Sequence, residues 1–270
     1  MTNPWTAALI TLFLWWFSTG AILWRVRHAD RLGGSAHVMS VLLGLPLVIG
    51  GVVGLGVSLD DATSPGTYLA FLSALALWGW IELAFLSGVI TGPMTDPCPA
   101  YSQGWDRFRR AVLTILWHEA VLIAALALLA YAAWDAANPF GLYTFALLFF
   151  ARLSAKLNLF FGVPRIHTEF LPRPLAHLAS HFRHARMNWV FPISITLLTF
   201  ATGFWLERAI GTSIEAPTEG ARVGLVLLTA LTALALLEHW FMVLPLPDQK
   251  LWRWMLPASP TSDPTLLPRK

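Results

Sequence analysis

The sequence predicts an all-α integral membrane protein, a polytopic bundle of about seven transmembrane helices. Of its 270 residues, 56% are hydrophobic and only 12% are charged, whereas ordinary soluble domains are about a quarter charged. Several apolar stretches have roughly the 20 residues that a helix needs to cross a hydrocarbon core about 30 Å thick. Their expected limits are 4–24, 37–59, 68–90, 111–134, 140–161, 189–206 and 223–244.

The first stretch is not expected to be a signal peptide, because no basic segment precedes it and its apolar core is too long. In the second stretch Pro46 predicts a kink. Gly50 and Gly54 in the same stretch form a small-xxx-small pair that lets helices approach closely. We expect this pair to pack within the chain, and dimerisation is the alternative. The turn-rich segment 91–99 follows the third stretch and cannot be helical throughout.

The uneven distribution of basic residues predicts the orientation in the membrane. All of the 18 Lys and Arg except Arg208 and Arg222 fall on one side of the stretches. Arg152 and Lys156 are counted with the long basic connection on that side, and Lys156 is expected to snorkel to the interface. Because cytoplasmic connections carry the excess of positive charge, we expect a periplasmic N-terminus and a cytoplasmic C-terminus. The net charge of +3 is therefore a topology signal, and no nucleic-acid partner is expected.

We expect one transmembrane domain over residues 1–256, followed by a disordered tail at 257–270 that is rich in Pro, Ser and Thr. The long connection after the fifth stretch is expected to contain a short amphipathic helix at about 172–187. Its apolar residues recur at spacings of 4, 3 and 4, which is typical of a basic helix lying on the cytoplasmic membrane face. They are Leu171, Leu175, Leu178 and Phe182.

Five ionisable residues lie inside three of the apolar stretches, where a charge costs at least a few kcal/mol. Counted from the expected cytoplasmic ends, they lie at similar depths of roughly 9 to 12 Å, at about 1.5 Å per residue. We therefore expect them to meet at one intramembrane site near the cytoplasmic face. They are Glu82, His118, Glu119, Glu238 and His239.

Several functions are open for such a site. Glu and His side chains in a helical bundle can bind iron, as in non-haem di-iron centres. An imidazole can instead bind the metal of a magnesium or iron tetrapyrrole, or the five residues can form a proton relay. A further alternative needs no ligand, because a salt-bridged network can hold the helices in register. Four tryptophans adjoin the ionisable residues and are expected to form a wall of the site: Trp78, Trp80, Trp117 and Trp240.

Other polar residues on the expected cytoplasmic side are weaker candidates. The spacing His177-x3-His181-x2-His184 is similar to the His boxes of membrane desaturases and hydroxylases, although it lacks their paired His-His. His167 and Glu169 can reach toward the site from the connection, but we interpret them as surface residues. Asn158 is expected to cap or bridge helices. The weaker candidates are thus His177, His181, His184, His167, Glu169 and Asn158.

Short segments spread between residues 78 and 256 carry a family resemblance. They include WIE at 80–82, ITGP at 90–93, WHE at 117–119, NLFFGVP at 158–164, EFLP at 169–172, MNWVFPIS at 187–194 and EHWF at 238–241. In order and spacing they resemble the PuhE family of photosynthetic complex assembly proteins. The resemblance implies a multi-pass protein of a bacterial inner membrane, and it implies no catalytic residue.

The resemblance also implies a role: assembly of photosynthetic complexes or modulation of bacteriochlorophyll supply. Together with the buried residues, it predicts an assembly factor whose Glu/His site binds iron or a bacteriochlorophyll-type Mg-porphyrin. The expected partners are membrane lipid and subunits of the reaction centre or the light-harvesting complexes. One alternative is a membrane di-iron oxygenase that acts on a tetrapyrrole or lipid precursor. Another is a non-catalytic scaffold with a buried salt-bridge network.

Overall fold

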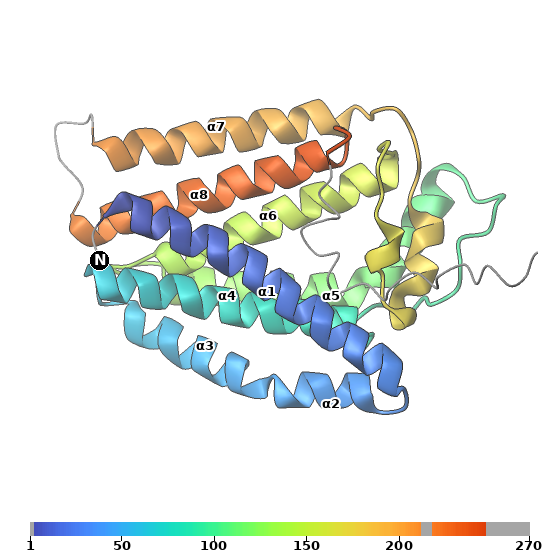
Figure 1. Ribbon diagram of the computed structural model, residues 1–270, viewed down its shortest axis with the longest axis horizontal. Coiled ribbons are helices and arrows are strands. Elements are labelled where there is room, and N and C mark those ends of the chain that lie inside the picture. The colour runs from blue at the N-terminus through green and yellow to red at the C-terminus, as the bar shows by residue number, and fades with distance from the viewer. Residues whose placement is uncertain (1–2, 212–217, 247–270) are drawn as a thin grey trace, which may run out of the picture.

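A computed structural model describes residues 3–211 and 218–246. Seven of its helical segments are long and apolar enough to cross a membrane, and the described part of the chain contains no strand. The helices lie side by side along one long axis (Figure 1). The predicted class, an all-α polytopic membrane bundle, is therefore confirmed. The tail predicted at 257–270 lies outside the described residues.

Polar side chains define where several helices begin. Asn3, Thr63 and Thr218 precede α1, α4 and α8, and each accepts a backbone N–H of the first turn. Such a bond satisfies a donor that the helix itself leaves unpaired. The elements are α1 Pro4–Leu32, α2 Ala36–Leu43, α3 Leu45–Ser58, α4 Ser64–Leu86, α5 Gly104–Ala132, α6 Phe140–Phe161, the 3-10 helices η1 Thr168–Phe170 and η2 Arg173–His181, α7 Val190–Ile210 and α8 Glu219–Phe241.

The second span is broken at Gly44 into α2 and α3, so the kink predicted at Pro46 is confirmed. Pro46 stands in the first turn of α3 and lacks the N–H that would continue the ladder of α2. From α4, Trp80 Nε1 donates to the carbonyl of Val41 at 3.0 Å. A Cβ at Gly44 would lie 2.9 Å from the Trp80 ring. Trp80 thus stabilises the break from the neighbouring helix.

Glycines of α3 pack closely against α4. A Cβ at Gly54 would lie 2.1 Å from Ser73 Oγ, and one at Gly51 would lie 3.0 Å from the Ser73 carbonyl oxygen. A Cβ at Gly50 would meet no atom within 4 Å. The glycines therefore serve packing within the chain, as expected, but Gly51 rather than Gly50 acts with Gly54.

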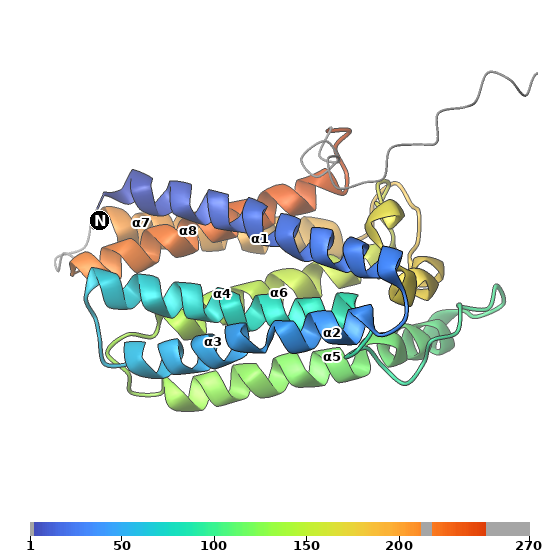
Figure 2. The same ribbon diagram turned by 60° about the horizontal axis from the view of Figure 1, so that its bottom comes forward.

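Two apolar clusters hold the spans together. One joins α1, α4 and α8 around Phe71 and Leu227. The other joins α3, α4, α5 and α6 around Ile81, Leu122 and Phe145. As a result α4 and α6 lie between α5 on one side and α8 on the other (Figure 2), and polar residues on these four helices can meet inside the bundle.

The connection between α6 and α7 differs from the surface helix predicted at 172–187. Only a 3-10 helix, η2, forms there, and it ends at His181. Leu175 and Leu178 are buried against Phe85 at the end of α4, with Leu171 and Phe182 beside them. The apolar stripe is therefore covered by the ends of α4 and α5 instead of a lipid surface. The spacing identifies the apolar face of this segment, but it does not distinguish a membrane surface from neighbouring helices as the partner of that face.

Candidate functional site

A cavity of about 350 Å³ lies inside the bundle between α1, α4, α6 and α8. Apolar and aromatic side chains form most of its wall, including those of Trp15, Phe71 and Trp78. Phe170 of η1 and His167, which precedes η1, line the cavity from the connection between α6 and α7. The volume is at the lower end of the range of small-ligand pockets, about 300 to 1,000 Å³, so the cavity can hold a small ligand or part of a larger one.

Three ionisable side chains from the spans line this cavity: Glu82 of α4, Arg152 of α6 and Glu238 of α8. Arg152 Nη2 donates to Glu82 Oε2 at 3.2 Å. Trp15 Nε1 of α1 donates to Glu238 Oε1 at 2.7 Å. Among the residues that the structure describes, no basic side chain forms an ion pair with Glu238. The cavity therefore contains one paired carboxylate and one that is held only by an indole N–H.

His118 lies behind Glu82, away from the cavity. Its Nε2 is 3.8 Å from Glu82 Oε1, and its ring stacks on Phe85 at a centroid distance of 4.3 Å. The side chain is fully buried, and within the described residues neither ring nitrogen has a hydrogen-bond partner. The next residue, Glu119, points elsewhere and forms an ion pair with Lys156 of α6.

His239 belongs to a separate, uncharged network. Its Nδ1 lies 2.8 Å from the carbonyl oxygen of Ala235, and its Nε2 lies 2.9 Å from Ser154 Oγ. Because the carbonyl can only accept, Nδ1 carries the proton, and in the neutral ring Nε2 accepts from Ser154. Ser154 Oγ is also 2.8 Å from Ser194 Oγ of α7. Both ring nitrogens of His239 are thus engaged by the protein.

Asn158 extends this network to the start of α7. It is fully buried, and its Nδ2 donates to the Ser154 carbonyl oxygen at 3.0 Å and to Ser194 Oγ at 2.9 Å. Its Oδ1 accepts from Asn188 Nδ2 at 3.1 Å. Asn188 Oδ1 in turn accepts the first two backbone N–H groups of α7. Asn158 therefore bridges α6 and α7.

Helix α6 carries the charged and the uncharged sets on opposite faces. Arg152 and Lys156 are four residues apart, as are Ser154 and Asn158, so each pair shares a face. The two pairs are offset by two residues, or about 200° around the helix. Neither Arg152 nor Lys156 was expected among the site residues, because both were assigned to the basic connection. The signal was the alternation of polar residues inside the span predicted at 140–161.

The structure brings together only part of the predicted five-residue site. Glu82 and His118 are neighbours, and Glu238 lines the same cavity as Glu82, whereas Glu119 and His239 have other partners. Within residues 3–211 and 218–246, no group of three or more His, Cys, Asp or Glu side chains is placed to hold a metal ion. The iron site and the histidine-bound tetrapyrrole thus stay predictions that these distances do not support.

Of the four tryptophans expected to wall the site, Trp78 lines the cavity and the other three do not. Trp117 faces outward from α5 and is 55% exposed. Trp240 packs edge-on against a phenyl ring of α7, and Trp80 holds the break between α2 and α3. Trp15 of α1, which was not expected at the site, lines the cavity together with Trp78.

The weaker candidates in the connection separate into three environments. His167 lines the cavity, and its Nδ1 is 3.2 Å from Glu169 Oε1. His181, the last residue of η2, is only 3% exposed. Burial lowers the pKa of its imidazole, and so does the positive charge of Arg107 and Arg110. Burial likewise lowers the pKa of His177. His184 is exposed to solvent.

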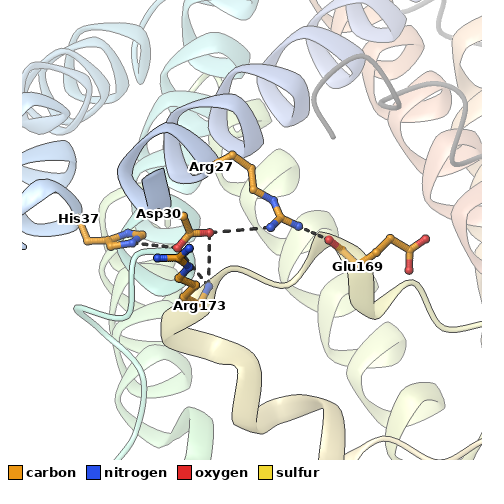
Figure 3. Close-up of polar contacts among 5 residues, drawn as sticks. All are labelled: Arg27, Asp30, His37, Glu169 and Arg173. Carbon is orange, nitrogen blue, oxygen red and sulfur yellow. Dashed lines mark hydrogen bonds and ion pairs between the residues drawn. The ribbon is translucent and has the colours of Figure 1, made fainter. Parts of the chain in front are cut away.

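Asp30 joins the end of α1 to the segment that lines the cavity mouth (Figure 3). Its carboxylate accepts the backbone N–H of Arg173, at 3.1 Å from Oδ1, and Oδ1 is also 3.1 Å from His37 Nε2. Arg27, one turn earlier in α1, donates to the carbonyl oxygen of Glu169. These contacts fix the chain on both sides of Phe170, which lines the cavity.

The fold and the cavity define the class of this chain: a polytopic helical membrane protein with ionisable residues in an intramembrane cavity. Residues 1–263 match the family described as "Protein of unknown function (DUF3623)", and the chain belongs to this family. It is 65% identical over 258 residues to an uncharacterised 30.4 kDa protein in the puhA 5' region of Rhodobacter capsulatus. The match covers 96% of this chain and 93% of that relative. No solved structure gives a significant match.

Proposed function

We propose that this chain is an integral membrane factor for the assembly of bacterial photosynthetic complexes, and that its intramembrane cavity binds a ligand in that role. The relative in the puhA 5' region and the resemblance to the PuhE family support the process. The seven apolar helices support the location in a membrane, and the relative supports a phototrophic bacterium as its source. The observation that carries the proposal of a ligand is the cavity of about 350 Å³ that exposes Arg152 and Glu238.

The proposed orientation has the cavity near the cytoplasmic face. The connections that follow α1, α4 and α6 lie at one end of the bundle, together with η1 and η2 (Figure 1). These connections and the helix ends beside them carry most of the Lys and Arg residues. Because positive charge is retained in the cytoplasm, this end is assigned to the cytoplasm and residue 3 to the periplasmic side.

A non-catalytic scaffold is the second candidate, because two ion pairs inside the bundle connect the helices. Glu82 pairs with Arg152 and Glu119 pairs with Lys156, so α6 is joined to both α4 and α5. A scaffold of this kind needs the pairs but does not need the cavity. The two candidates therefore differ in whether filling the cavity matters.

Deletion and complementation in a phototrophic bacterium test both parts of the proposal. Deletion of the gene is expected to reduce the near-infrared absorption of assembled reaction-centre and light-harvesting complexes, and the wild-type gene restores it. Ala151→Phe places a ring in the cavity and is expected to restore absorption poorly. Ala124→Phe, at an exposed position of α5, is the control and restores it fully.

Each outcome decides a separate part. Normal absorption in the deletion strain rules out the assembly role. Full restoration by Ala151→Phe, with both variants present at equal levels in the membrane, rules out a ligand in the cavity and leaves the scaffold.

A further inference from the structure

Arg152 has hydrogen-bonding capacity that the described residues do not use. It lies within the membrane-spanning helix α6, yet its side chain is 39% exposed where it lines the cavity. Its single hydrogen bond goes from Nη2 to Glu82, and its buried Nε has no partner in the described part of the chain. A guanidinium in hydrocarbon normally directs its donors at acceptors, because unpaired donors there are costly.

Glu82 does not satisfy the whole guanidinium. Only Oε2 of Glu82 reaches Arg152, whereas Oε1 is directed toward His118 and forms no hydrogen bond to a described residue. The contact is therefore a single bond instead of the paired, parallel bonds that Arg forms with a carboxylate in its preferred geometry. The Nη donors of Arg152 that Glu82 does not use are available to a second acidic group.

We propose that the cavity binds an amphiphile by its carboxylate or phosphate group, with Arg152 as the residue that holds the acid. Carboxylates and phosphates are the groups that the guanidinium fork fits best, because two of their oxygens can accept parallel N–H bonds. The aromatic and aliphatic wall around Trp15, Trp78 and Phe170 receives the apolar body of the ligand. The inference rests on the proposed function in that it names the ligand class of the same cavity.

The cavity offers an internal test of the sign of the ligand's charge. Glu238 lines the same space on α8 and is bonded to Trp15 alone among the described residues. A cationic ligand would pair with Glu238, and an anionic ligand would pair with Arg152. Loss of one or the other side chain therefore affects the two kinds of ligand in opposite ways.

Lys156 provides a matched control on the same helix face. It is one turn beyond Arg152, carries the same charge, and is engaged by Glu119. It does not line the cavity. Lys156→Gln removes one positive charge from α6, as Arg152→Gln does, but it leaves the acid-binding group of the cavity in place.

The experiment measures binding of radiolabelled oleate to the purified full-length protein in phosphatidylcholine nanodiscs. Oleate is expected to bind at one site, and methyl oleate, which lacks the charge, is expected to compete at least about tenfold more weakly. Arg152→Gln weakens oleate binding by about tenfold or more, whereas Lys156→Gln and Glu238→Gln leave it within about twofold or strengthen it.

Two further competitors identify the source of the acid. Lysophosphatidate is compared with monoolein, and a porphyrin carboxylic acid is compared with its methyl ester. Stronger competition by lysophosphatidate points to a lipid phosphate, and stronger competition by the porphyrin acid points to a pigment precursor. Both results support the inference, because both ligands present an acid to Arg152.

Equal competition by acids and esters overturns the inference, and this comparison uses the wild-type protein, so it does not depend on the folding of any variant. Weaker oleate binding in Glu238→Gln than in Arg152→Gln also overturns it, since Arg152 would then not be the residue that holds the acid. Neither result changes the outcome of deletion and complementation, so the assembly role stands or falls separately.

Discussion

The two faces of α6 bury polar groups in different ways. Toward α7 and α8, Ser154 and Asn158 form an uncharged network with Ser194 and His239. None of these side chains has a buried polar atom without a partner in the described structure. Toward α4 and α5 the face is charged, and there several buried polar atoms have no hydrogen-bond partner among the described residues. They belong to Glu82, His118 and Arg152.

This difference separates a structural network from a candidate site. Buried polar groups usually find partners, and a group without one calls for an explanation. On the uncharged face the bonds among Ser154, Asn158, Ser194 and His239 side chains join α6 to α7 and α8, so the network has a structural role in supporting the fold. On the charged face Glu82 and Arg152 line the cavity, and the Arg152 side chain is 39% exposed there, so a ligand in the cavity can reach its guanidinium.

The largest effect on stability is expected at the centre of the uncharged network. Asn158→Leu removes the bonds to Ser154, Ser194 and Asn188 and leaves their partners buried. We expect a loss of about 3 kcal/mol in the free energy of unfolding, measured by thermal unfolding in detergent. A melting temperature equal to that of the wild type would show that the network does not support the fold.

Glu238 and His239 are neighbours on α8, but they belong to the cavity and to the uncharged network respectively. Variants that affect one or the other therefore compare the stability contributed by the two polar regions. Ser154→Ala leaves His239 Nε2 without its partner, and we expect a loss of about 1 to 2 kcal/mol. Glu238→Gln keeps an oxygen that can accept from Trp15, so we expect a change below about 0.5 kcal/mol. A larger destabilisation by Glu238→Gln than by Ser154→Ala would contradict the assignment of the structural role to the uncharged network.

On the charged face a double-mutant cycle is expected to show non-additive effects. Glu82→Leu and Arg152→Leu each leave an unpaired charge, and each is expected to cost about 1 to 2 kcal/mol, a range reduced because Arg152 is partly exposed. The double variant is expected to unfold near the wild-type temperature, since it removes both charges together. It should nevertheless fail to discriminate oleate from methyl oleate. Additive losses in the double variant would contradict this expectation.

The smallest expected effect is a pH dependence outside the spans. His181 is buried with a lowered pKa, so the unfolded chain binds its proton more tightly than the folded chain. Docking of the connection therefore keeps its full stability above about pH 6.5 and loses stability as the pH falls below that value. Hydrogen exchange in residues 162–189, corrected for the intrinsic rate, should accelerate between pH 7.5 and 5.5.

His181→Gln should reduce this acceleration, because it removes one of the buried imidazoles. His184→Gln is the control, since His184 is exposed and should leave the acceleration unchanged. The reverse pattern would place the titrating group at the surface.

Hydropathy was enough to locate the seven spans, because the length of an apolar run is set by the bilayer. The depth of the ionisable residues also predicted that Glu82 and His118 meet. It did not predict the partners of Glu119 and His239, because adjacent helical residues point about 100° apart and reach different neighbours. The position of a residue in the sequence gives its level along the helix axis, but the neighbour that its side chain meets depends on how the helices pack.

The cations of α6 escaped prediction for a different reason. The distribution of Lys and Arg predicts which end of a helix is cytoplasmic, so Arg152 and Lys156 were counted as part of that signal. Their true positions depend on carboxylates of α4 and α5 that are distant in sequence. Trp80 shows the same limit, because its role depends on the backbone break at Gly44.

The interleaved rows of α6 restrict how its length can change during evolution. One residue inserted before Arg152 would turn the rest of the helix by about 100° and shift it by about 1.5 Å, so both rows would lose their partners at once. Two inserted residues would exchange the rows and present cations to Ser194 and His239. Insertions and deletions in related chains should therefore avoid this helix and accumulate in the turns at either end of it.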